Sequence, residues 1–263
     1  MARATSSSTT ALDPAARGGV ETWYDAWYTP KVIHGGRGDD DLVGAGADDH
    51  LYGHGGDDIL QGRAGDDYLA GGDGRDLLLG EEGDDILLGG TGNDICSGEE
   101  GADYIHTGDG DDWGIGGDGN DLIYGGGGDD YLDAGNGDDV VWGGSGNDQI
   151  LGGAGDDELH GGGGNDVIYA HGGNDTVYGD AGDDLIVGGS GFNELWGGSG
   201  ADTFLMGTDY GWPDIIKDFE AQDTVTGHHY AISGGHTLIY TSSDQLVFIL
   251  ENYDASVEGI TWY

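Results

Sequence analysis

Eighteen aspartates follow one another at nine-residue intervals along most of this chain, and Asn193 stands where one further aspartate would fall. Together with carbonyls left free by a glycine-rich backbone, they form the all-oxygen ligand set that Ca²⁺ prefers. The cysteine and histidine pattern of a zinc site is absent. The candidate ligands are Asp40, Asp49, Asp58, Asp67, Asp76, Asp85, Asp94, Asp103, Asp112, Asp121, Asp130, Asp139, Asp148, Asp157, Asp166, Asp175, Asp184 and Asp202.

These aspartates hold position 6 of a nine-residue repeat that runs without insertion or deletion from Gly35 to Leu205. The consensus is G-G-x-G-x-D followed by an apolar residue between two variable ones. Position 4 is glycine in 18 of 19 blocks, and position 8 is Leu, Ile, Val or Phe in 17, with Cys96 and Gly114 as departures. A disordered acidic linker needs no such register, so the repeats indicate one periodic structure.

Each block divides into a turn and a short strand. The first six residues form the turn, because glycine adopts positive φ without steric penalty. The last three predict a very short strand, whose central apolar side chain faces inward while its neighbours face outward.

The composition limits what can hold such a fold together. The chain has 7 Lys and Arg against 52 Asp and Glu, a net charge of -45, and Leu, Ile, Val and Phe make up just under a fifth of it. The stack of position-8 side chains is too thin a core by itself, and the single cysteine forms no internal disulfide. Nucleic acid and anionic membranes repel such a chain, and no apolar stretch is long enough to span a bilayer. Cations are therefore the expected partners.

The repeat resembles the RTX (repeats-in-toxin, or hemolysin-type) nonapeptide array. This resemblance implies an all-β fold, a right-handed parallel β-roll with small caps at both ends, and calcium as the bound ion. Two blocks form one coil, so turns n and n+2 lie one coil apart on the same side. Nineteen turns paired in this way give at most 17 calcium sites, which would add 34 positive charges to -45 and leave about -11.

Because an unfolded chain lacks such sites, the free energy of calcium binding becomes free energy of folding. We expect a chain that is largely disordered without calcium and a rigid rod with it. Position 5 is also often acidic, as at Asp39, Asp48 and Asp57. We interpret these residues as turn residues that face water, and a direct ligand role is the alternative.

Four regions are expected along the chain: a disordered tail at 1–18, an aromatic cap at 19–34 with Trp23 and Trp27, the roll at 35–205, and a C-terminal cap at 206–263. The N-terminal region has no apolar stretch typical of a cleaved signal peptide. The segment from Asp214 to Phe219 resembles the one that closes β-rolls of this family. The resemblance implies a type I secretion signal in 206–263, and hence an extracellular or cell-surface protein.

No catalytic constellation emerges. Neither H-E-x-x-H nor G-x-S-x-G occurs, and only 34 residues precede the array, too few for a catalytic domain. A zinc site at His228, His229 and His236 is a minor alternative to solvated histidines. We expect a non-catalytic protein.

The two outer faces of the roll are expected to differ. Position 9 of the even-numbered blocks is rich in aromatic residues, including Tyr124, Trp142 and Trp196, whereas the odd-numbered blocks are more aliphatic. Strand propensity alone explains such residues. Two alternatives are a polysaccharide on the aromatic face and self-association through the aliphatic face. The overall hypothesis is a secreted calcium-binding structural or partner-binding protein; the alternative is a polysaccharide-binding module or an accessory fragment of a larger toxin or hydrolase.

Overall fold

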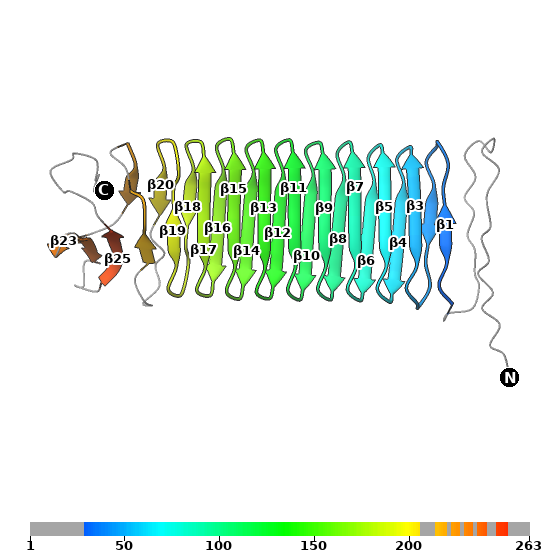
Figure 1. Cartoon of the computed structure of the whole chain (residues 1–263), viewed down its shortest axis with the longest axis horizontal. Helices are drawn as coiled ribbons and strands as arrows, with labels where there is room; N and C mark the ends of the chain where they lie inside the picture. Colours follow the sequence, from blue (N-terminus) through cyan, green and yellow to red (C-terminus); the bar gives the residue numbers. More distant parts are fainter. Residues whose placement is uncertain are drawn as a thin grey trace.

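The chain forms a roll of two facing β-sheets whose strands alternate between them (Figure 1). The computed structural model describes residues 29–205, 214–219, 222–226, 229–233, 236–240 and 246–251, with side chains only up to Val225. The expected aromatic cap residues Trp23 and Trp27 and the tail at 1–18 lie outside the described residues.

Sheet A has, in spatial order, β1 (Val32–His34), β3 (His50–Gly55), β5 (Tyr68–Asp73), β7 (Ile86–Thr91), β9 (Tyr104–Asp109), β11 (Leu122–Gly127), β13 (Val140–Ser145), β15 (Glu158–Gly163), β17 (Thr176–Ala181), β19 (Glu194–Trp196), β21 (Asp214–Ile216), β25 (Leu246–Glu251), β24 (His236–Tyr240) and β23 (His229–Ser233). Sheet B has β2 (Asp41–Val43), β4 (Ile59–Ala64), β6 (Leu77–Glu82), β8 (Ile95–Glu100), β10 (Trp113–Asp118), β12 (Tyr131–Asn136), β14 (Gln149–Ala154), β16 (Val167–Gly172), β18 (Leu185–Val187), β20 (Thr203–Leu205) and β22 (Thr224–Thr226).

Strands within the repeat region pair in parallel with the strand eighteen residues further on. Leu122 of β11 lies opposite Val140 of β13, and Tyr131 of β12 lies opposite Gln149 of β14. Two repeats therefore make one coil, and the predicted all-β parallel roll is confirmed.

The interior strands are longer than expected, with six residues each in place of three. Positions 1 to 3 of each block also pair with the next coil, as where Gly117 lies opposite Gly135 and Asp118 opposite Asn136. The turn proper is thus only about three residues long. Backbone pairing between coils, which composition does not reveal, lengthens the strands.

The core is the single expected stack of position-8 side chains. These side chains are fully buried from Leu51 to Phe204, apart from Gly114, which has none. At Gly114 a Cβ would stand 3.3 Å from Cγ2 of Thr107 and 2.9 Å from Cδ2 of Leu132. The methyl group of Thr107, at position 1 of the same block, therefore fills part of the space left by Gly114.

The roll continues past Leu205, where we expected it to end. Strands β21 and β22 extend sheets A and B, and their Ile216 and Val225 are fully buried like position-8 residues. Three extra residues between Leu205 and Asp214 shift the pattern, which hides the continuation in the sequence. Beyond it, β25 pairs in parallel with β21, and β24 and β23 follow antiparallel.

Candidate metal centre

The position-6 aspartates form two buried columns, because the turns that carry them connect sheet A to sheet B and stack coil upon coil. In every such turn from Asp58 to Asp202, Oδ1 accepts a hydrogen bond from the backbone N–H of the position-6 residue one coil earlier, at 2.6–3.0 Å. Asn193 accepts the same bond through its amide oxygen. One oxygen of each carboxylate thus ties adjacent coils together.

The second carboxylate oxygen, Oδ2, is buried in sixteen of these aspartates and has no hydrogen-bond partner. A buried carboxylate oxygen without a donor is strongly destabilising unless a cation compensates it. The sixteen residues are Asp58, Asp67, Asp76, Asp85, Asp94, Asp103, Asp112, Asp121, Asp130, Asp139, Asp148, Asp157, Asp166, Asp175, Asp184 and Asp202. The burial of these unpartnered oxygens therefore indicates that a positive ion compensates them.

Burial also changes the acidity of the columns. Desolvation raises the pKa of Asp67 and of Asp130 to about 7 and that of Asp58 to about 6, only partly offset by the backbone hydrogen bonds that each accepts. Neighbouring carboxylates raise these pKa values further. A proton can therefore occupy these sites in competition with a metal ion.

Small residues at position 1 leave room for the free oxygen. A Cβ on Gly53 would stand 2.3 Å from Oδ2 of Asp58 and 2.7 Å from the carbonyl oxygen of Gly71 in the next coil. The carboxylate and a backbone carbonyl therefore face the same space. No three His, Cys, Asp or Glu side chains converge on a metal-sized site within the described residues. The donor set is one carboxylate per turn plus carbonyl oxygens, which suits calcium better than zinc.

The position-5 residues also stack coil upon coil, on the outside of the position-6 columns. The N–H of Asp57 donates to Oδ1 of Asp39 one coil earlier at 3.0 Å, and the N–H of Asn147 donates to Oδ1 of Asp129 at 2.7 Å. These side chains are exposed, in keeping with turn residues that face water, but they also connect coils. Their bonds run in the opposite direction to those of position 6.

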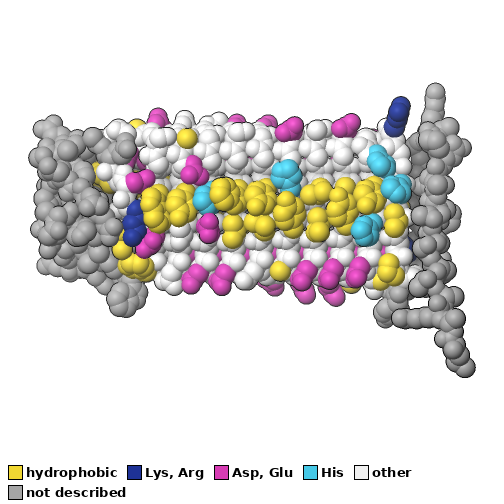
Figure 2. Space-filling model, viewed as in Figure 1, with side chains coloured by type: hydrophobic (Ala, Val, Ile, Leu, Met, Phe, Trp, Pro, Cys, Tyr) yellow, Lys and Arg dark blue, Asp and Glu magenta, His cyan; other side chains and the backbone are white. Residues whose placement is uncertain are grey.

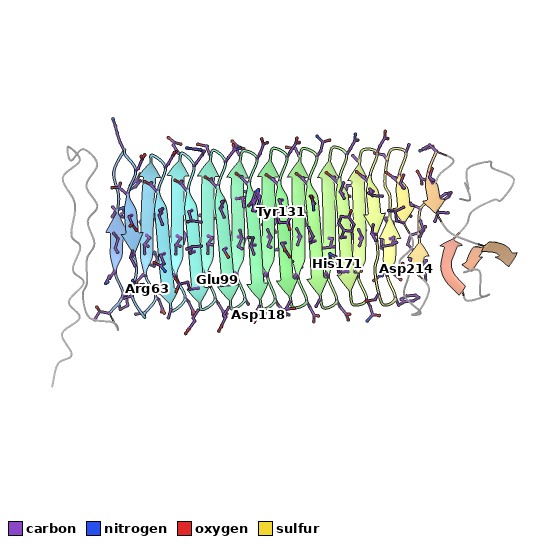
Figure 3. All side chains as sticks on the ribbon, turned by 180° about the vertical axis from the view of Figure 1, so that it is seen from behind. Arg63, Glu99, Asp118, Tyr131, His171 and Asp214 are labelled. Carbon is purple, nitrogen blue, oxygen red and sulfur yellow. The ribbon has the colours of Figure 1, made fainter. Side chains whose placement is uncertain are left out.

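Two further aspartates continue the position-6 columns and were missed in the sequence. Oδ1 of Asp214 accepts the N–H of Asn193 at 3.2 Å, and Oδ1 of Asp223 accepts the N–H of Asp202 at 3.2 Å. Asp214 lies at the end of the regular coils (Figure 3). The signal was present: in D-T-V-T, residues 223–226, aspartate again precedes an apolar residue by two positions, nine residues after Asp214.

A family model for the RTX calcium-binding nonapeptide repeat matches this chain over residues 34–209, in eight overlapping segments. The chain belongs to this family. Its repeats are therefore of a calcium-binding class, and the buried Oδ2 atoms of the position-6 columns have the oxygen chemistry that such an ion requires.

Two solved structures resemble the chain. The solution structure of the AlgE6R3 subunit from the Azotobacter vinelandii mannuronan C5-epimerase is 29% identical and covers 41% of this chain and 78% of its own, with a TM-score of 0.34. The crystal structure of the extracellular lipase LipA from Serratia marcescens is 15% identical and covers 92% of this chain and 40% of its own, with a TM-score of 0.17. No curated protein matches the RTX chain.

The histidines of the alternative zinc site can be described only in part. His228 lies outside the described residues, and His229 and His236 are described only as backbone in β23 and β24. The described part of the chain contains no helix that could cross a membrane.

The aromatic residues on sheet A stack on one another. Trp142 and His160 have ring centroids 3.7 Å apart and nearly parallel planes, and Tyr178 and Trp196 continue the column at 4.5 and 4.7 Å. Figure 2 shows the resulting apolar band along the roll, with acidic side chains towards both rims. Ring faces that cover each other are not available to a sugar ring, which needs an open face. Little open ring face is therefore left at these residues for the polysaccharide that the sequence offered as an alternative.

Proposed function

We propose that this chain is a secreted, non-catalytic calcium-binding β-roll that folds when calcium fills its position-6 columns. The observation that carries the proposal is the set of sixteen buried, unpartnered Oδ2 atoms in a chain of net charge -45. Without cations, ionised carboxylates would repel one another along both columns. With calcium, the same oxygens become ligands and the coils are held together.

The free oxygens also bear on the number of ions. One ion for each of the sixteen Oδ2 atoms would add 32 positive charges to -45 and leave -13. A total of sixteen ions is close to the limit of 17 sites expected from pairing successive coils. Most of the compensation of the chain's negative charge would then come from bound calcium.

Circular dichroism tests the folding switch directly. The full chain should show little β-structure in excess EGTA and a strong β-spectrum in millimolar Ca²⁺, with magnesium as the control cation. Magnesium is a poor substitute because it demands near-octahedral geometry and gives up its water reluctantly. Identical spectra in EGTA and in calcium would defeat the proposal.

Secretion rests on the family resemblance and on the logic of calcium. A chain that stays unfolded where calcium is scarce and folds where it reaches the millimolar range suits export in the unfolded state. An export assay on a chain without residues 206–263 tests this, with calcium-dependent folding of the truncated chain measured in parallel. Unchanged export would remove the type I signal from that region.

A structural or partner-binding role is supported by sheet B. Its outer side chains Ile59, Ile95 and Trp113 are 40–53% exposed, and Asp133 is the one charged residue at positions 7 and 9 of these strands from Ile59 to Leu205. A second copy could pack on these two rows, beside which Arg63, Glu81 and Glu99 lie at position 2 of β4, β6 and β8. Sedimentation of the calcium-loaded chain should show a dimer that Ile95→Ser with Trp113→Ser abolishes. A monomer at all concentrations would exclude self-association through this face.

A further inference from the structure

The backbone at position 2 separates the turns into two classes. From His54 to Gly198, every position-2 residue has a positive φ, between 71° and 125°. Gly36 and Ala45, the position-2 residues of the first two blocks, do not. The change falls at the third block, which is also where the unpartnered carboxylate oxygens begin, at Asp58.

In the first two turns the backbone takes the place that a cation would have. The N–H of Gly36 donates to Oδ2 of Asp40 at 2.5 Å, and the N–H of Ala45 donates to Oδ2 of Asp49 at 2.6 Å. The other oxygen of Asp49 accepts the N–H of Lys31 at 2.6 Å. Asp49 is therefore fully buried with both oxygens satisfied by backbone donors. In the later turns no position-2 N–H reaches the carboxylate, and its Oδ2 stays unpartnered.

Asn193 produces a third exception by a different route. Its amide Nδ2 donates to Oδ1 of Asp214 at 2.9 Å, while its own oxygen accepts the N–H of Asp175 at 2.8 Å. A neutral side chain with a donor thus stands in the column where every neighbouring block has a carboxylate. The side-chain amide of Asn193 therefore donates directly to the carboxylate of Asp214, the next aspartate in the column.

We infer that calcium loading of this roll is interrupted at defined turns. The sixteen turns from Asp58 to Asp202 with a free Oδ2 bind calcium through that oxygen, whereas the turns of Asp40, Asp49 and Asn193 are closed by N–H donors of the chain and take none. This inference rests on the proposed calcium-binding function and assigns it turn by turn. The first coil would then be held by hydrogen bonds alone, without a bound metal ion.

Native mass spectrometry of the full chain, at saturating free calcium, counts the bound ions. Asp49 and Asp67 form a matched pair, since they lie in the same column one coil apart. Asp67→Asn should lose at least one ion, and Asp49→Asn should keep the wild-type number. Circular dichroism in calcium verifies that each variant is folded. An equal loss of ions from both variants would overturn the inference.

Asn193→Asp is the deciding variant, because it adds a carboxylate and removes no candidate ligand. It replaces the amide donor to Asp214 by a second negative charge, which a cation must compensate. One additional bound ion is expected. An unchanged count, or a chain that no longer folds in calcium, would contradict the inference. A wild-type chain that binds no calcium would instead defeat the proposed function itself.

Discussion

At the scale of single residues, each position-6 aspartate divides two tasks between its two oxygens. In Asp130, Oδ1 accepts the N–H of Asp112 at 2.9 Å, while Oδ2 is buried without a donor. The first contact sets the stacking of coils and the second leaves a ligand for a cation. A substitution by asparagine can keep the first task but not the second, because the amide offers a neutral oxygen and a nitrogen donor in place of the charge.

From the third block on, position 2 carries backbone strain wherever it is not glycine. Glu99 has a φ of 80°. Similar positive φ values occur at His54, Arg63, Glu81, His171 and Asp180. Left-handed backbone is unfavourable for residues with a Cβ and costs glycine nothing. Glu99 lies towards one rim of the roll (Figure 3), where it pairs with Glu81 of the neighbouring strand.

Glu99→Gly should therefore stabilise the calcium-loaded roll by roughly 0.5–1 kcal/mol, the relief of strain less the added entropy of the unfolded chain. Urea denaturation in saturating calcium measures the change. Glu99→Gln is the matched control, since it removes the same charge and keeps the strain. If the glutamine variant gained as much stability as the glycine variant, charge and not backbone geometry would be the cause.

At the scale of the elements, the strands depend on a core only one side chain thick, so a defect in one block must be repaired nearby. Gly114 leaves a gap in the stack, and Thr107 enters it with its methyl group while its hydroxyl donates to the carbonyl oxygen of Gly125 at 2.8 Å. The two departures from consensus in this block thus compensate each other.

Thr107→Gly should destabilise the loaded roll by about 1–3 kcal/mol, because it opens a cavity and removes a buried hydrogen bond. Gly114→Val alone should also destabilise, since its side chain would meet Thr107 and Leu132. The double variant should be more stable than the sum of the two changes predicts, by a coupling that a denaturation cycle measures. Simple additivity would show that the two sites do not share the space.

The aromatic column on sheet A is a second inter-strand contact. Its members lie on successive strands, and His160 is only 9% exposed between Trp142 and Tyr178. Stacked pairs of this kind contribute beyond the apolar area that they bury.

A double-mutant cycle on Trp142→Ala and His160→Ala should give a coupling of roughly 0.5–1.5 kcal/mol in urea denaturation with calcium. Trp142→Ala combined with Tyr169→Ala, on the other sheet, is the control and should show no coupling. Equal couplings in both cycles would mean that the column contributes nothing specific.

At the scale of the whole molecule, the two buried columns couple folding to cations of any kind, protons included. The pKa values of Asp67, Asp85 and Asp103 are raised to about 7 by burial, from 3.8 for an unperturbed group. The folded chain without metal therefore binds more protons than the unfolded chain between about pH 4 and pH 7. Its stability is greatest below the unfolded pKa and falls as pH rises through the folded one.

In calcium-free buffer, β-structure should accordingly increase when the pH is lowered from 8 to 5.5, as measured by circular dichroism. When calcium is limiting, the amount of bound calcium should instead decrease as the pH is lowered through 7, because protons compete with calcium for Oδ2. A metal-free spectrum that does not change between the two pH values would contradict this account of the columns.

The sequence by itself determined the period, the inward-facing position 8 and the ligand role expected for the acidic position 6, because a nine-residue repeat without insertions keeps each position in the same register from block to block. Residues 206–263 were harder to interpret, since three extra residues shift Asp214 and Asp223 out of phase. Only the tertiary structure decided which aspartates keep a free oxygen. That outcome depends on the φ of position 2 and on donors eighteen or more residues away, as at Asp49 with Lys31 and Asp214 with Asn193. Such donors come together only when the coils are stacked.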